Sequence, residues 1–186
     1  EDETTPSVEE TTPILPDLQN NIVHGNSLIG LNELQNKTLL DNELLEIVPF
    51  DWKNINNGDN FTAIIGNPPY VKTEDMHNLL PQSEFELYKK HYQTAYKQFD
   101  KYFLFVERAI QKVAEEGYVC FIIPNKFFKI GAGEKLRKLI AAKGYLISLD
   151  DFGDSQLFFD KTIYSSILFL QKKNNLAFSY TKVDSL

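Results

Sequence analysis

The sequence predicts an α/β fold built on a mostly parallel, doubly wound sheet. Between residues 98 and 170, apolar runs typical of strands alternate with segments whose apolar residues recur every three or four positions. The continuous apolar run at 118–123 is typical of a parallel strand covered on both faces. Alternating strands and helices imply right-handed crossovers, so functional loops are expected where the strands end.

Each element is predicted from apolar periodicity and from the residues that interrupt it. The clearest helix is predicted at 98–116, with Gly117 just past its end. Residues 61–65 indicate a buried strand, and the polar, aromatic segment 71–96 is expected to hold short helices and to act as a flap. The remaining expectations are strands at 21–24, 145–149, 165–170 and 177–181, and helices near 37–47 and at 134–142.

Composition and charge bound the class of protein. The 186 residues suffice for one domain, and no apolar run is long enough for a transmembrane helix. Most of the net charge of −7 comes from residues 1–20, whose six acidic and no basic residues predict a Pro- and Thr-rich tail or linker. No secretory signal is visible, and the single Cys120, expected in the core, excludes an internal disulfide, so a cytoplasmic protein is expected.

Charged and metal-ligating residues give weaker indications. Basic clusters at 89–101 and 126–143 suit phosphate contacts, but solvated helix faces are the commoner role for such runs. The three histidines lack the spacing of metal ligands, and Gly131-Ala132-Gly133 indicates a turn into a helix rather than a phosphate loop. We therefore predict no metal site.

The clearest chemistry lies in Asn67-Pro68-Pro69-Tyr70, directly after the predicted strand 61–65. The Asn67 side-chain oxygen and the Pro68 carbonyl are placed to accept both protons of an amino group, and Tyr70 to stack on the ring that bears it. Neither acceptor titrates near neutral pH, so the pattern indicates positioning of a weakly basic nitrogen rather than general-base catalysis. Methyl transfer from S-adenosylmethionine to such a nitrogen needs this kind of site. An ordinary strand-to-loop turn is the alternative.

Several segments in order resemble the gamma-type amino-methyltransferases that modify adenine in DNA, above all the methylase part of type IIG restriction–modification enzymes. The matching segments are residues 21–28, 67–70, 98–100, 117–128 and 151–168, which are similar to the third to eighth motifs. The resemblance implies a partial Rossmann-like S-adenosylmethionine-dependent methyltransferase fold over residues 21–175. The glycine-rich first motif and the acidic second motif are absent, and residues 176–186 would begin the connection to a missing target-recognition domain.

The resemblance also implies roles for particular residues. Double-stranded DNA would present a flipped adenine between Tyr70 and Phe158, with its amine held by Asn67 and Pro68. The implied S-adenosylmethionine contacts are Asn26, Ser27, Asn67 and Pro69. The implied DNA contacts are Lys72, Asn125 and Lys126. Other roles stay open, because Asn26 or Ser27 would also suit a helix N-cap and Phe158 would also suit the core.

Two other functions remain open from the sequence. The same four-residue loop occurs in methyltransferases that act on RNA bases or on a protein glutamine. The long region after Tyr70 and the aromatic residue Phe158 favour DNA. A catalytically silent fragment that contributes DNA contacts or an assembly surface is the second alternative. Without the first motif, the isolated chain is expected to show little cofactor affinity and no turnover.

Overall fold

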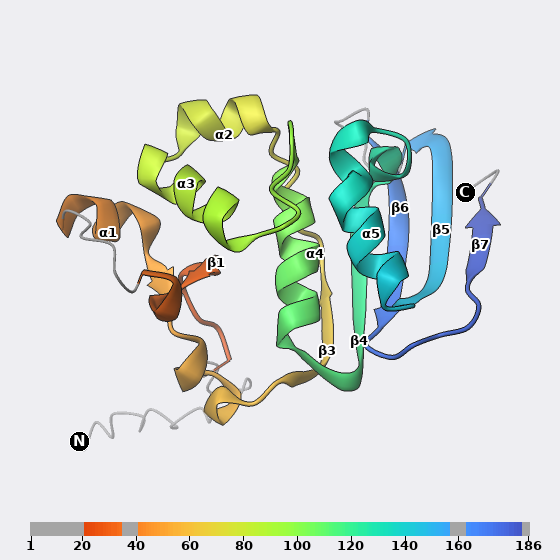
Figure 1. Cartoon of the computed structure of the whole chain (residues 1–186), viewed down its shortest axis with the longest axis horizontal. Coiled ribbons are helices and arrows are strands. Elements are labelled where there is room, and N and C mark those ends of the chain that lie inside the picture. Colours follow the sequence, from red (N-terminus) through yellow and green to blue (C-terminus); the bar gives the residue numbers. More distant parts are fainter. Residues whose placement is uncertain (1–20, 35–40, 157–162, 184–186) are drawn as a thin grey trace, which may run out of the picture.

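The computed structural model describes residues 21–34, 41–156 and 163–183, and its main feature is a five-stranded sheet (Figure 1). Across the sheet, the strands are β3 (Phe61–Gly66), β4 (Val113–Pro124), β6 (Tyr164–Gln171), β5 (Leu146–Gln156) and β7 (Ser179–Lys182). β3 is parallel to β4 and β5 to β7, whereas β6 runs antiparallel to both of its neighbours. The predicted tail at 1–20 and the predicted stacking residue Phe158 lie outside the described residues.

A second, two-stranded sheet stands apart from the first. Its parallel strands are β1 (Asn26–Gly30) and β2 (Pro49–Phe50), and β1 packs against α3 (Gln82–His91) and α4 (Lys101–Lys112). Three of the five strand pairings are therefore parallel, which confirms the α/β class and the mostly parallel pairing.

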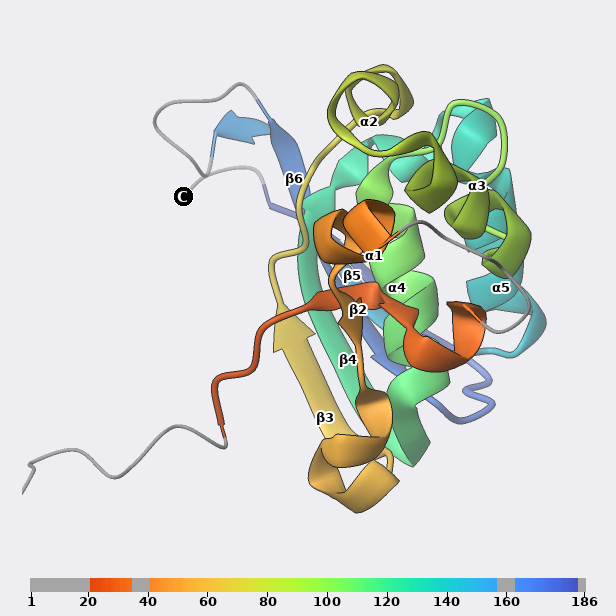
Figure 2. The same ribbon diagram turned by 90° about the vertical axis from the view of Figure 1, so that its left-hand side faces the viewer.

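The helices of the described chain lie on one face of the five-stranded sheet (Figures 1 and 2). α4 and α5 (Glu134–Ala142) pack on the strands. α1 (Asp41–Ile47), α2 (Thr73–Leu79) and α3 lie beyond α4, on the side away from α5. Short 3-10 turns connect these elements, namely η1 (Leu31–Leu34), η2 (Trp52–Asn54), η3 (Asn56–Gly58), η4 (Asn125–Phe128) and η5 (Gly131–Gly133).

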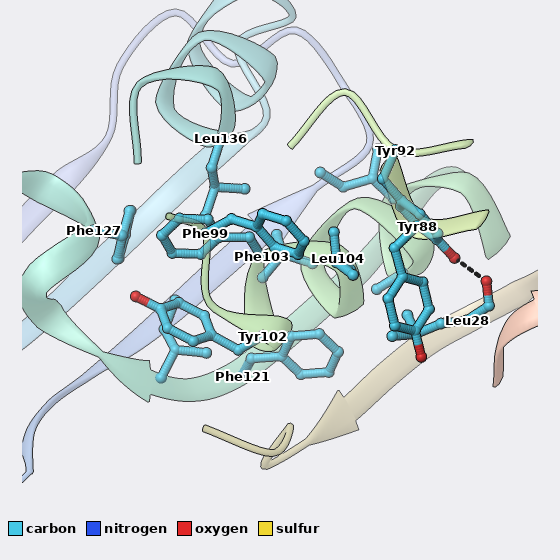
Figure 3. Packing of buried hydrophobic residues seen from close by; sticks show 14 of the residues in the cluster. Leu28, Tyr88, Tyr92, Phe99, Tyr102, Phe103, Leu104, Phe121, Phe127 and Leu136 are labelled. Carbon is cyan, nitrogen blue, oxygen red and sulfur yellow. Dashed lines mark hydrogen bonds between the residues drawn. The ribbon is translucent and has the colours of Figure 1, made fainter. Parts of the chain in front are cut away.

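The core is unusually aromatic and forms where α4 meets its neighbours (Figure 3). Tyr102 and Phe103 on α4 are fully buried, beside Phe99 just before the helix. Burying a side chain of this size contributes about 1.5–3 kcal/mol to stability. Phe85 and Tyr88 of α3 join the same core, so the segment 71–96 is packed into the domain and the expectation of a flap is wrong.

Among the described residues, no helix packs on the second face of the sheet (Figures 1 and 2). Val119, Phe121 and Ile123 of β4 point to the helices and are buried, whereas the alternate residue Tyr118 is 41% exposed. The predicted strand 118–123 therefore exists, but the expectation that it is covered on both faces is wrong. Cys120 lies on this second face and is half-buried rather than part of the core.

β3 and the end of α4 also differ from the sequence expectation. The apolar run at 61–65 forms β3, but β3 is the edge strand of the sheet and Ile65 is 81% exposed, so the expectation of a buried strand is wrong. The helix at 98–116 ends at Lys112, because β4 already begins at Val113. Gly117 therefore lies inside β4, where a Cβ would come within 2.8 Å of the Thr62 carbonyl oxygen.

Buried polar groups fasten β1 to α4. The Arg108 guanidinium on α4 donates to the Leu28 carbonyl at 2.8 Å, to Glu33 at 2.7 Å and to the Tyr92 hydroxyl at 2.7 Å. The Tyr92 hydroxyl in turn donates to the Leu28 carbonyl at 2.5 Å (Figure 3). Glu33 accepts from the Gly30 amide as well, so the carboxylate is fixed on both sides. We call this set of contacts the arginine clamp.

Candidate active site

The loop Asn67–Tyr70 begins where β3 ends, at the edge of the sheet. Asn67 and Pro69 are exposed, Pro68 is buried and Tyr70 is half-buried. Proline fixes φ and has no N–H to donate, so the loop is stiff and rich in acceptors. The parallel strand β4 ends at Pro124 beside this loop, as expected for functional loops that gather at the carboxyl ends of parallel strands.

Tyr70 is held in place by its hydroxyl and by its ring. The hydroxyl oxygen lies 2.5 Å from Asn67 Oδ1 and 3.0 Å from the Ile122 carbonyl oxygen. The hydroxyl has one proton to donate. When another donor binds the Asn67 oxygen, the hydroxyl can still donate to the Ile122 carbonyl. The ring stands edge-on to Tyr102 at 6.1 Å between centroids. Burial raises the pKa of Tyr70 to about 12, so the phenol stays neutral at physiological pH.

A cavity of about 230 Å³ opens beside the Tyr70 ring, and we call it the tyrosine pocket. Its lining residues are Tyr70, Lys72, Asp100, Pro124, Asn125, Lys126, Ile163 and Tyr164. The structure thus brings the predicted Tyr70, Lys72, Asn125 and Lys126 to one site. The volume lies below the 300–1,000 Å³ typical of sites for drug-sized ligands, which suits a single planar ring system.

Tyr164 is the one lining aromatic that sequence reasoning missed. It is 44% exposed and begins β6, whose next residue Ser165 pairs with Pro124 at the end of β4. Its place in the sequence, directly before an apolar strand, gave no sign that it would line the same pocket as Tyr70. Pairing between distant strands decides that position.

The charges at this pocket are partly neutralised. Lys126 Nζ lies 2.9 Å from the Asp100 carboxylate, which is only 4% exposed. Burial raises the pKa of Asp100, although the Lys126 hydrogen bond and the charges of Lys126 and Lys72 act in the opposite direction. Lys72 is exposed at the start of α2. Of the two predicted lysine contacts, Lys72 therefore has the more available charge.

Asn125 is fixed by the neighbouring strand β5. Its amide donates to Asp151 Oδ1 at 2.8 Å and to the Gly153 carbonyl at 3.3 Å. Asp151 also accepts from the Gly153 amide and from the Tyr180 hydroxyl. Burial acts to raise the pKa of Asp151, but these hydrogen bonds outweigh it and hold the pKa below its usual range. Asn125 thus joins β5 to the wall of the pocket.

Asn26 and Ser27 lie elsewhere than the sequence suggested. They begin β1 instead of following a strand at 21–24, and they cap no helix. The Asn26 amide nitrogen donates to Glu84 at 2.9 Å and to Tyr88 at 3.2 Å, and its oxygen accepts from the Leu28 amide. The Asn26 side chain is therefore hydrogen-bonded to protein partners, and the expectation of a strand at 21–24 is wrong, because the strand runs from Asn26 to Gly30.

Within residues 21–34, 41–156 and 163–183, no group of three or more His, Cys, Asp or Glu side chains is arranged to hold a metal ion. Among those residues, none of the helices has the length and apolar character needed to cross a membrane.

Solved structures with the same arrangement of strands and helices define the fold class. A putative class I S-adenosylmethionine-dependent methyltransferase from Listeria monocytogenes matches 68% of this chain and 38% of its own, with a TM-score of 0.53 and 20% identity. The restriction–modification enzyme MmeI, solved with DNA, matches 73% of this chain and 19% of its own, with a TM-score of 0.56 and 14% identity. The chain therefore has the fold of class I methyltransferases.

Sequence comparison defines the family. Residues 9–158 match the Eco57I restriction-modification methylase family, and the chain belongs to this family. It is 46% identical to the type II restriction enzyme and methyltransferase RM.Eco57I of Escherichia coli over 183 residues, which is 98% of this chain. It is also 32% identical over 114 residues, 61% of this chain, to the type II methyltransferase M.PaeR7I of Pseudomonas aeruginosa. The chain spans only 17% and 19% of the lengths of these two relatives.

Proposed function

We propose that this chain forms part of the catalytic region of a DNA adenine-N6 methyltransferase in a restriction–modification system. The observation that carries the proposal is the loop Asn67–Tyr70 at the end of β3, with Tyr70 lining a pocket of about 230 Å³. The named functions of the relatives support the same assignment: RM.Eco57I is a restriction enzyme and methyltransferase, and M.PaeR7I is a methyltransferase.

The proposed chemistry uses neutral groups that position the target amine. The amine of a flipped adenine donates one N–H to the Asn67 oxygen and the other to the Pro68 carbonyl, so its lone pair is free to attack. The Tyr70 hydroxyl retains the Ile122 carbonyl as its acceptor while Asn67 binds the substrate. Tyr70 stacks on one face of the base, and the second aromatic comes from Phe158 or Tyr164. A base–aromatic stack contributes about 1–3 kcal/mol, which offsets part of the cost of flipping.

S-adenosylmethionine is the proposed methyl donor, and the described residues fit it in part. When bound, it supplies a sulfonium methyl group, which the amine nitrogen takes as the C–S bond breaks and one N–H proton is released. Asn67 and Pro69 are exposed at the open edge of the sheet and are available to hold it. The side chain of Asn26 is engaged with Glu84 and Tyr88, so we do not assign it this role. Ser27 remains a proposed contact.

Transfer of tritiated methyl groups from S-adenosylmethionine tests the proposal. The protein that carries this chain should label adenine in unmethylated DNA, and Asn67→Ala should lower the rate by about 100-fold or more, as loss of one positioned hydrogen-bonding group does elsewhere. DNA binding should change little, because Asn67 contributes one contact. Label on RNA or on a protein glutamine instead of DNA would refute adenine in DNA as the substrate.

The 186-residue chain, assayed alone, addresses the silent-fragment alternative. We expect it to show little cofactor affinity and no turnover, because its open β3 edge and engaged Asn26 leave few cofactor contacts. Micromolar affinity for S-adenosylmethionine, measured by calorimetry, would contradict this expectation.

A further inference from the structure

A second, larger cavity continues from the tyrosine pocket. It has a volume of about 600 Å³, shares Lys72, Asp100 and Lys126 with that pocket, and extends to Lys97 and Gly131. The start of α2 and the loop before α4 supply part of its lining, and the turns η4 and η5 before α5 supply the rest. We call this cavity the lysine groove. It brings together residues from the two basic clusters that lie about thirty residues apart in the sequence.

Positive charge is concentrated in the lysine groove although the chain as a whole carries −7. Lys126 is balanced by Asp100, but Lys72 and Lys97 are both exposed, with Glu74 as the other acidic lining residue. An exposed pair of ammonium groups in a cavity suits a ligand that carries repeated negative charge.

Two further lysines on α5 lie near Lys97, outside the lining of the groove. Lys97 and Lys135 both lie over the ring of Tyr96, with Nζ at 4.9 Å and 5.5 Å from its centroid. The hydrogen bond and charge of Lys138, with smaller contributions from the charges of Lys97 and Lys135, hold the pKa of Glu134 below its usual range. Lys138 pairs with Glu134 at 2.6 Å, so Lys97 and Lys135 add positive charge beside an acid that already has a partner.

The backbone that presents Lys97 is unusual and firmly braced. Lys97 has a positive φ of 55°, a conformation that non-glycine residues rarely adopt. The buried Glu107 carboxylate holds the preceding turn by accepting from the amides of Gln93 and Thr94 and from the Thr94 hydroxyl. Backbone strain of this kind persists only where the surrounding structure enforces it, and it is common at ligand sites.

The opposite side of the groove is formed by the turn that contains Gly131. Arg137 donates from one guanidinium nitrogen to the Phe127 and Ile130 carbonyls and so braces the turn. Gly131 has no side chain, and a Cβ there would lie 3.6 Å from Lys97 Nζ, in space that a ligand can use.

We propose that the lysine groove binds the phosphodiester backbone of the DNA strand that carries the target base, with Lys72 and Lys97 as its phosphate contacts. The proposal rests on the proposed function. A flipped base stays attached to its own backbone, so that backbone must pass the mouth of the tyrosine pocket. The groove is continuous with that mouth and carries the matching charge.

The test is the salt dependence of DNA binding by the protein that carries this chain. Fluorescence anisotropy with a labelled DNA duplex would be measured from low to moderate salt for the wild type and for the double variant Lys72→Gln/Lys97→Gln. Removing two phosphate contacts should lower the slope of log K against log salt by about 2 and weaken binding by roughly tenfold at moderate salt. The matched control is Lys90→Gln/Lys143→Gln, which removes the same charge from exposed sites outside the groove and should leave the slope unchanged.

The salt slopes test the lysine groove independently of the methylation chemistry. Equal slopes for the groove variant and the control would overturn the proposal even if the protein methylates adenine in DNA. A reduced slope for the groove variant alone would support it. Groove-dependent binding of an RNA competitor that is tighter than binding of DNA would overturn the assignment to a DNA strand.

Discussion

Removing Arg108 should strongly destabilise the chain, because the arginine clamp is the main polar link between β1 and α4. Arg108 is 7% exposed and makes three hydrogen bonds of 2.7–2.8 Å with Tyr92, Leu28 and Glu33. Removing one partner of a buried ion pair costs about 3–5 kcal/mol, chiefly because the other partner keeps its burial without compensation. The Glu33 side chain is 20% exposed and regains some hydration, so we expect about 3 kcal/mol for Arg108→Met.

Urea denaturation of the 186-residue chain, followed by circular dichroism, measures this cost. The expected result is a lower midpoint with an unchanged m-value, which reports a change in stability rather than in compactness. Lys138→Gln is the control, because Lys138 and Glu134 form an exposed pair on α5 that should have no measurable effect. A loss below 1 kcal/mol for Arg108→Met would refute the view that the clamp stabilises the fold.

The pH dependence of the same clamp has a definite sign. Burial acts to raise the pKa of Glu33, but the hydrogen bond and charge of Arg108 outweigh it and hold the pKa below its usual range. A carboxyl whose pKa is lower in the folded state stabilises the fold above its unfolded pKa, near 4.5, and loses that contribution as the pH falls through the folded value. The stability difference between the wild type and Glu33→Gln should therefore be larger at pH 7 than at pH 3. A difference that is equal at both values would contradict the assignment.

Three further predictions address the site and its supports. Tyr70→Phe keeps the stacking ring but removes the hydroxyl that donates to the Ile122 carbonyl and holds the ring in place, so kcat for methyl transfer should fall about three- to tenfold while KM for DNA stays within twofold; a larger change in KM would argue against this role. Gly133→Ala should lower stability by about 1–3 kcal/mol, because a Cβ there would lie 2.2 Å from a backbone oxygen, whereas Gly131→Ala should be tolerated; thermal melts of both variants give the comparison. Burial raises the pKa of Cys120, so it should react with iodoacetamide at pH 8 more slowly than a cysteine in an unstructured peptide, as mass spectrometry would show.

Local sequence patterns were sufficient for much of the fold. The strand at 61–65 and the helix at 134–142 form as predicted, because apolar periodicity reports directly which backbone conformation a segment prefers. The chemical character of Asn67–Tyr70 was also evident from the sequence, since two prolines make a stiff, acceptor-rich loop whatever surrounds it.

Other features depend on which distant segments meet. An apolar run indicates that a strand has neighbours but not how many, so the exposed edge at Ile65 was invisible in the sequence. The same limit applied to Asn26, whose amide is engaged by Glu84 and Tyr88 from α3, 58 and 62 residues away.

The sequence by itself determined the α/β class, the loop that carries the chemistry and the family to which the chain belongs. Only the tertiary structure decided that Tyr164 and Tyr70 line one pocket, and that Lys72 and Lys97 share a groove beside it. The physical reason is that backbone preference is set by neighbours along the chain, whereas a binding site is set by strand order and packing between segments that no local pattern connects.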